Sequence, residues 1–400
     1  MNRFPTPSLR VSVSLYFAIG GFLSSSWIAR IPAMTSRLDL STGTLGLILL
    51  AFSAGALMSF PLAGGLAGTR GSAWTTRIFG LGYTITFPLL GFAWHPVVLI
   101  VALWLYGFTF GGMDVAMNAQ GVEVERKVKT NILGSLHGLF SLGAMAGAAL
   151  SGVVAGFGTS LQVHFTIVAV LGLLILIWAG KSLIPDDVEV VTSTEKVRDP
   201  RFVLPPRALW PLGIIAFCAA VSEGGMADWS ALHIHDSLDA SEGTAAYGFT
   251  IFSLTMLTGR FLGDRIVAIF GNVRVIRWCA GVASIGYLIG ILIDTIWSVI
   301  IGYGLIGLGL SVVIPLVYRS AGNAKGIPRG RAVASVATIG YSGFLAAPPI
   351  LGLVAEVSSL QLTMIIIGAL CAVIVLFAGA TAPGATGPDE VADSVAFDIA

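Results

Sequence analysis

The sequence is poor in charged residues. Asp, Glu, Lys and Arg make up 11% of its 400 residues, against roughly 25% in ordinary soluble proteins, so a soluble chain could not cover its surface with hydrated groups. The 22 Lys and Arg are balanced by 21 Asp and Glu, which excludes a basic nucleic-acid-binding domain. The three cysteines all lie inside apolar stretches, which excludes a disulfide scaffold.

Signatures of catalysis are also missing. The sequence contains no Walker phosphate-binding loop, so ATP is not expected as an energy source. No nucleophile is grouped with a general base, and His233 and His235 alone are too few ligands to predict a metal site. We therefore expect neither an enzyme nor a bound cofactor.

Apolar residues make up 56% of the chain, and the mean hydropathy is +0.89. Glycine, at 50 residues, suits helices that pack closely in a membrane. Because about 20 apolar residues cross the hydrocarbon core of a bilayer as a helix, the sequence predicts an all-α membrane protein with twelve transmembrane helices. The predicted spans are 9–32, 43–67, 74–94, 96–120, 132–157, 161–184, 209–232, 244–264, 272–294, 297–319, 331–356 and 360–382.

The positive charges predict the orientation of these spans. With the N-terminus placed in the cytoplasm, every Lys and Arg except Arg30 and Arg37 falls at a cytoplasmic end or loop. This asymmetry is the usual one for membrane proteins. We expect a multi-pass protein of the cytoplasmic (inner) membrane with both termini in the cytoplasm.

A polar stretch divides the chain. Residues 185–208 carry charges, hydroxyls and prolines without an apolar period, which predicts a cytoplasmic linker. The linker separates two six-helix bundles, predicted at 1–184 and 209–382. Residues 383–400 contain acidic residues, glycine and proline but no Lys or Arg, and are predicted to be a disordered cytoplasmic tail.

The two halves repeat in sequence. A shift of 200 places Ser135, Gly143 and Gly152 on Ser335, Gly343 and Gly352, and a shift of 202 places Trp27 on Trp229 and Gly46 on Gly248. Parallel repeats of six helices, joined by a central linker, are the organisation of the major facilitator fold.

Short motifs carry the same resemblance. The segment from Gly259 to Arg265, GRFLGDR, resembles the G-x-x-x-D-R loop of major facilitator proteins, whereas its first copy at 64–71 has Gly68 at the acidic position. The segments WIARIP at 27–32 and GMDVAMNAQ at 112–120 resemble the MosC-like and YbjJ-like branch of that superfamily. The stretch DVAMN at 114–118 is also similar to a motif of the fucose permease family.

This resemblance implies two pseudo-symmetric halves that move a small organic solute by alternating access. We expect proton coupling, a polar and sugar-like substrate, contact with the lipid bilayer, and a monomer. Two alternatives remain open: an exporter of amphipathic compounds, and a membrane sensor or assembly protein that binds without transporting.

Ionisable residues inside the spans are the candidates for proton coupling, because a charge at the centre of a span costs roughly 2.5–3.5 kcal/mol. Asp114 shares one helical stripe with Gly107, Gly111 and Asn118, and the resemblance places its span at a central cavity. Glu223 in the seventh span is the second candidate. His137 lies at a depth similar to that of Asp114, so it could pair with Asp114 or simply bond a neighbouring helix.

Other polar and aromatic residues are candidates for substrate binding or gating. Trp27 and Trp229 could stack on a flat substrate or lie at the membrane interface. The remaining candidates for substrate contact are Ser26, Asn118 and Gln120. The predicted gating residues are Arg30 and Asp228, as an ion pair at the outer ends of the first and seventh spans, and Asp264 and Arg265 on the cytoplasmic side.

Overall fold

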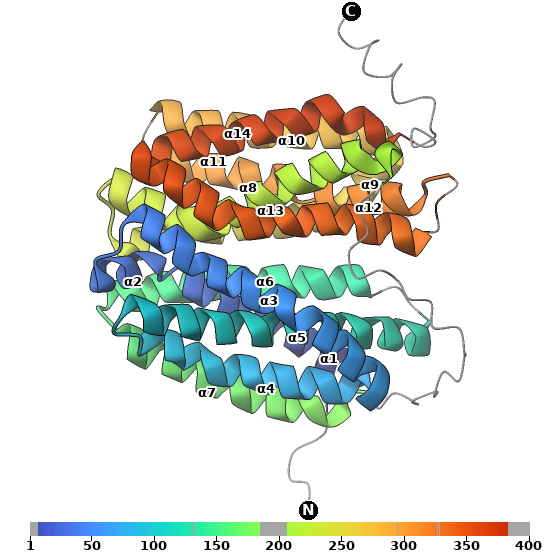
Figure 1. Ribbon diagram of the computed structural model, residues 1–400, viewed down its shortest axis with the longest axis horizontal. Coiled ribbons are helices and arrows are strands. Elements are labelled where there is room, and N and C mark those ends of the chain that lie inside the picture. The colour runs from blue at the N-terminus through green and yellow to red at the C-terminus, as the bar shows by residue number, and fades with distance from the viewer. Residues whose placement is uncertain are drawn as a thin grey trace, which may run out of the picture.

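The computed structural model describes residues 7–129, 132–184, 206–293, 295–325, 327 and 329–382, and these form helices and turns without a strand. Most of the predicted linker and the whole predicted tail lie outside the described residues. Figure 1 shows two bundles stacked on one another, with α1 to α7 in one and α8 to α14 in the other. The helices of the first bundle are α1 (Leu9–Ile28), α2 (Ile31–Leu38), α3 (Thr42–Arg70), α4 (Ser72–Gly91), α5 (Pro96–Val128), α6 (Leu133–Gly156) and α7 (Leu161–Ala179). Those of the second are α8 (Trp210–Leu232), α9 (Glu242–Phe270), α10 (Asn272–Ile293), α11 (Ile296–Leu310), α12 (Val313–Gly322), α13 (Arg329–Val357) and α14 (Leu360–Phe377).

Two predicted spans are each split in two. The first divides into α1 and α2 at Arg30, where Pro32 occupies an early position of the second piece. The tenth divides into α11 and α12 at 311–312. Because a proline cannot donate a backbone hydrogen bond, it is well placed in the first turn of a new helix. The twelve predicted spans therefore correspond to fourteen α-helices.

Ten segments of the described chain are long and apolar enough to cross a membrane. The helices α4 and α9, which fall outside that set, occupy the positions of the third and eighth predicted spans. Many large apolar side chains face outward, including Leu174 at 59% exposure and Leu292 at 78%. An apolar surface of this extent requires a lipid environment.

The same local signals recur in the two halves. The hydroxyls of Ser41 and Ser241 cap α3 and α9 by accepting from the backbone N–H three residues on. Gly71 and Gly271 join these helices to the next with φ of 90° and 80°, a backbone conformation that favours glycine. In each pair the second residue number exceeds the first by 200.

Helix contacts correct the repeat register predicted for the first spans. A Cβ atom on Gly352 would lie 2.9 Å from the Cα of Gly46, and one on Gly152 would lie 3.0 Å from the Cβ of Ala246. These two contacts are equivalent when Gly46 corresponds to Ala246, a shift of 200. The shift of 202, which paired Gly46 with Gly248, therefore does not describe the packing of α3 and α9.

The two halves meet at one end of the bundle, which we call the Arg30 end and which holds α2 in Figure 1. There α3 packs on α13 and α6 packs on α9. The carboxylate of Glu356 accepts hydrogen bonds from the Gly43 N–H and the Thr42 hydroxyl, both at 3.0 Å. The two halves are therefore held together at this end by direct contacts.

At the opposite end, the Gly71 end, several glycines of α3 and α6 have no close neighbour. A side chain added at Gly64, Gly65, Gly68 or Gly134 would meet no described atom within 4 Å. The same helices, α3 and α6, are tightly packed against the other half at their Arg30 ends. The two halves are thus in close contact at the Arg30 end, and these four positions at the Gly71 end take no part in contacts between them.

Candidate functional site

A cavity of about 360 Å³ lies between the two halves. Side chains from α1, α3, α5 and α6 line it on one side, and side chains from α8, α9 and α13 line it on the other. A molecule bound there would touch both halves. Any relative movement of the halves would therefore change its contacts.

The apolar lining follows the internal repeat. Phe52 and Ser53 of α3 line the cavity, as do Phe252 and Ser253 of α9, and a shift of 200 relates the two pairs. Because equivalent helices present equivalent side chains, the cavity is walled by aromatic rings on both sides.

The charged lining residues depart from the repeat. At a shift of 200, Asp114 corresponds to Ile314 and Arg260 to Phe60. The packing supports this shift, because Gly107 meets the Phe52 carbonyl and Gly307 meets the Phe252 carbonyl. These two charges thus have apolar counterparts in the other half. A charge in an apolar wall is costly, so both positions mark where the two halves have acquired different roles.

Arg260 is a cavity residue that the sequence reasoning missed, since it was assigned to the cytoplasmic end of its span. Its guanidinium lies 3.7 Å from the Glu223 carboxylate in the same half. It also donates a hydrogen bond of 2.7 Å to the hydroxyl of Ser141 on α6, in the other half. The available signal was a lone arginine within the predicted apolar span 244–264 whose repeat counterpart is Phe60.

Asp114 lines the cavity from α5, as predicted. The side-chain amide of Asn118, one turn along the helix, donates to the Asp114 carboxylate at 3.2 Å and to its backbone carbonyl at 2.8 Å. Asn118 thus positions Asp114 and is not itself among the cavity-lining residues.

His137 does not pair with Asp114. Its ring packs edge-on against Phe17 of α1, with ring centroids 5.2 Å apart, and it is not among the cavity-lining residues. His137 and Asp114 were predicted at similar depths in the membrane, but the depth of a residue does not determine the direction in which its side chain points from the helix axis. The close packing of α6 on α1 turns His137 toward that helix.

Of the two candidates for substrate contact in the first span, Trp27 lines the cavity and Ser26 does not. Trp27 lines the cavity together with Ser24 and Ser25, while the hydroxyl of Ser26 donates to the Phe22 carbonyl of its own helix at 2.8 Å. Trp229 is fully buried and packs against Gly352, outside the cavity lining. Trp229 is therefore a packing residue in this conformation.

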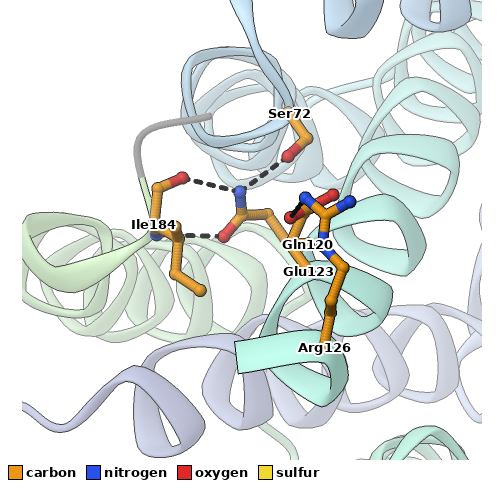
Figure 2. A network of polar contacts seen from close by, with 5 residues as sticks. All are labelled: Ser72, Gln120, Glu123, Arg126 and Ile184. Atoms are coloured by element: carbon orange, nitrogen blue, oxygen red, sulfur yellow. Dashed lines mark hydrogen bonds and ion pairs between the residues drawn. The ribbon is translucent and has the colours of Figure 1, made fainter. Parts of the chain in front are cut away.

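Gln120 lies outside the cavity lining and forms hydrogen bonds within the first half (Figure 2). Its buried amide donates to the Ser72 hydroxyl at 2.6 Å and to the Ile184 carbonyl at 2.9 Å, and it accepts from the Ile184 N–H at 3.1 Å. These bonds tie the end of the first half to α4 and α5.

Replacing Gln120 should therefore affect stability and not binding. Gln120→Leu removes three hydrogen bonds from a buried position, and we expect it to destabilise the fold by about 1–3 kcal/mol. Two quantities are measured on the purified variant: its thermal unfolding temperature and its affinity for a ligand. If the variant unfolds at the same temperature as the parent protein but binds ligand poorly, Gln120 contacts the substrate and this interpretation is wrong.

The predicted ion pair between Arg30 and Asp228 is not formed. The Arg30 guanidinium lies 3.6 Å from the carboxylate of Glu242 on α9 and donates to the Thr159 carbonyl at 2.9 Å. Asp228 instead lines the cavity. The break of the first span at Arg30 directs the arginine toward α9, which charge counting could not reveal.

The second predicted gate lies on α9 near the Gly71 end. Arg265 is exposed there, and the side chain of Asp264 lies outside the described part of the chain. Gating by this pair remains a prediction.

The chain resembles known proteins in sequence and in structure. A profile of the Major Facilitator Superfamily matches residues 13–236 and 212–396. The chain is 34% identical over 357 residues to an uncharacterized MFS-type transporter of Yersinia pestis, covering 89% of this chain and 91% of that protein. It is 27% identical over 362 residues to the membrane protein MosC of Rhizobium meliloti, covering 89% and 86%.

A solved structure has the same architecture. The nucleoside transporter NupG aligns with a TM-score of 0.72 and 13% identity, over 94% of this chain and 99% of that one. At that identity the likeness shows the fold alone. Together these matches confirm the predicted fold of two six-helix halves and the resemblance to MosC.

Proposed function

This chain belongs to the major facilitator superfamily, and from that premise we propose that it moves a small organic solute by alternating access, driven by protons. The observation that carries the proposal is the cavity between the halves, which is closed at one end and contains ionisable side chains from both. The lining supplies binding groups for a solute and a carboxylate that can take up a proton.

The Arg30 end corresponds to the outer face in the orientation that the positive charges predict. In that orientation the conformation is inward-facing. The outward-facing state requires α3 to part from α13 and α6 from α9 at the Arg30 end. Arg260, which contacts Ser141 across the halves, would lose or exchange that bond during the movement.

Asp114 is our proposed proton carrier. It faces the cavity and its described partner is the neutral amide of Asn118, so no cation holds the carboxylate in its charged form. Glu223, by contrast, has Arg260 at 3.7 Å, and an opposite charge at that distance favours ionisation. The ion pair of Glu223 with Arg260 is better suited to a different role. It can link a change in the charge of Glu223 to the hydrogen bond that Arg260 makes with Ser141 in the other half.

The cavity supports an amphipathic solute over the sugar-like one expected from the sequence. Sugars are held by several hydrogen-bonding side chains, and Asn118, Gln120 and Ser26 are not among the lining residues. The lining does include hydroxyls of serine and tyrosine, but most of its surface is apolar, with aromatic rings from both halves and a few ionisable groups. Such a lining suits a molecule with an apolar body and a polar or charged group.

A non-transporting sensor is the alternative from another class. An assay with the purified protein in sealed vesicles distinguishes a transporter from a sensor, because a sensor would bind ligand without moving it across the membrane. A thermal-shift screen of solutes finds ligands first, since binding raises stability by mass action. Movement of a hit that depends on a pH gradient supports the proposal, and binding without movement contradicts it.

The orientation gives a separate prediction. In a variant lacking the three native cysteines, Ser358→Cys at the Arg30 end should react with an impermeant maleimide in intact cells. Lys181→Cys at the Gly71 end should react only after permeabilisation. Both residues are exposed, so access depends on the side of the membrane alone. The reverse pattern would contradict the proposed orientation.

A further inference from the structure

The carboxylates of the cavity differ in their partners. Glu223 has Arg260, and Asp114 has the Asn118 amide. Within the described part of the chain, Asp228 receives no hydrogen bond and has no cationic side chain within ion-pair distance, although it lines the cavity. A carboxylate in an apolar wall without a partner is unstable in its charged form until a cation or a proton reaches it.

Asp228 also has a distinct depth. It lies five residues beyond Glu223 toward the Arg30 end of α8, which is about 7.5 Å along a helix axis. Trp27, the last residue but one of α1, lines the same closed end of the cavity. Phe249 lines it from the first turns of α9. Asp228 is therefore the acid nearest the closed end, and aromatic rings line that end with it.

A carboxylate and aromatic faces both favour one kind of ligand group. Organic cations form ion pairs with carboxylates and are attracted to the faces of tryptophan and phenylalanine rings. Farther from the Arg30 end, Phe52 and Phe252 continue the aromatic wall from both halves. That wall can accept an apolar body attached to the cation.

The cavity lining has more acidic than basic side chains among its described residues. Among the described lining residues, the carboxylates are Asp114, Glu223 and Asp228, and the one basic residue is Arg260. Arg260 offsets the charge of Glu223, which it contacts. The remaining acidic charge disfavours an anionic solute and favours a cationic one.

We propose that the cavity selects a monocationic amphipathic compound, whose cationic group binds Asp228 at the closed end and whose apolar body lies between Phe52 and Phe252. This inference rests on the proposed function, because it names the substrate class of the same cavity. It gives Asp228 a role distinct from that of Asp114, which carries the proton.

The test compares a cation with its neutral isostere. The probes are 3-(trimethylammonio)phenol and 3-tert-butylphenol, which have nearly the same shape and differ in charge. Binding to the purified full-length chain is measured by calorimetry and by thermal shift. We expect the cation to bind at least about tenfold more tightly than the isostere, as charge-assisted contacts allow.

Variants locate the site. Asp228→Asn, which keeps the shape and removes the charge, should abolish the preference for the cation, and Asp228→Glu should retain part of it. Asp39→Asn is the matched control, since Asp39 is an exposed carboxylate outside the cavity lining, and it should bind like the parent protein. An undiminished preference in folded Asp228→Asn would overturn the assignment.

The parent protein alone can also overturn the proposal. If it binds the two probes equally, the cavity does not select cations, whether or not any variant folds. Because binding in detergent needs no transport, this outcome is distinct from failure of the proposed function. A protein that binds the cation and moves nothing across a vesicle membrane would contradict transport and leave the cation site standing.

Discussion

Asp114→Asn should abolish accumulation of solute against its gradient while leaving counterflow largely intact. Asparagine keeps the shape of the side chain and can still receive the Asn118 hydrogen bond, but it cannot take up and release a proton. A gradient of one pH unit supplies about 1.4 kcal/mol per proton, enough for about tenfold accumulation. We expect the accumulation ratio of the variant to fall to about one.

The measurement uses proteoliposomes with an imposed pH gradient for accumulation, and equal pH on both sides for counterflow. Counterflow needs no net proton movement, so its survival shows that the variant folds and binds. Asp39→Asn is the control for loss of a carboxylate elsewhere. Normal gradient-driven accumulation by Asp114→Asn would remove Asp114 from the coupling mechanism.

Gly46→Leu should abolish transport by preventing closure of the Arg30 end. A Cβ atom on Gly46 would collide with the Pro348 carbonyl oxygen across the interface between the halves. Overpacking of this kind costs about 1–3 kcal/mol, which shifts a two-state balance by roughly 5- to 150-fold. The contact joins α3 to α13, so each half can fold without it.

Closure is read out by the accessibility of a cysteine at Leu49, a cavity residue on the same helix. In the orientation proposed here, Leu49→Cys should be protected from an impermeant maleimide in intact cells and should become reactive when Gly46→Leu is added. Gly281→Leu is the control, because a side chain at Gly281 meets no described atom within 4 Å. Unchanged protection in Gly46→Leu would mean that this contact does not close the cavity.

Composition, the apolar runs and the repeat were enough to predict two six-helix halves, because they depend on length and hydropathy. They also gave the depth of Asp114, Glu223 and Trp27, which all line the cavity. Rotation about the helix axis was not predictable, since it depends on which neighbouring helix packs closest. This is why Ser26 and Gln120 proved to face other partners.

The register of the repeat identifies Arg260 as an unusual residue. With the shift of 200 that describes the packing of α3 on α5 and of α9 on α11, Arg260 falls opposite the apolar Phe60. The predicted shift of 202 does not pair these two residues. The partner of Arg30 was beyond the sequence, because it depends on the break between α1 and α2.

Solute and proton movement should be coupled across one cavity. The most direct test encloses a pH-sensitive dye in proteoliposomes at equal pH on both sides and adds a transported solute to the outside. We predict a change of internal pH that follows solute movement and is absent in Asp114→Asn. Solute movement without any change of internal pH would contradict the account.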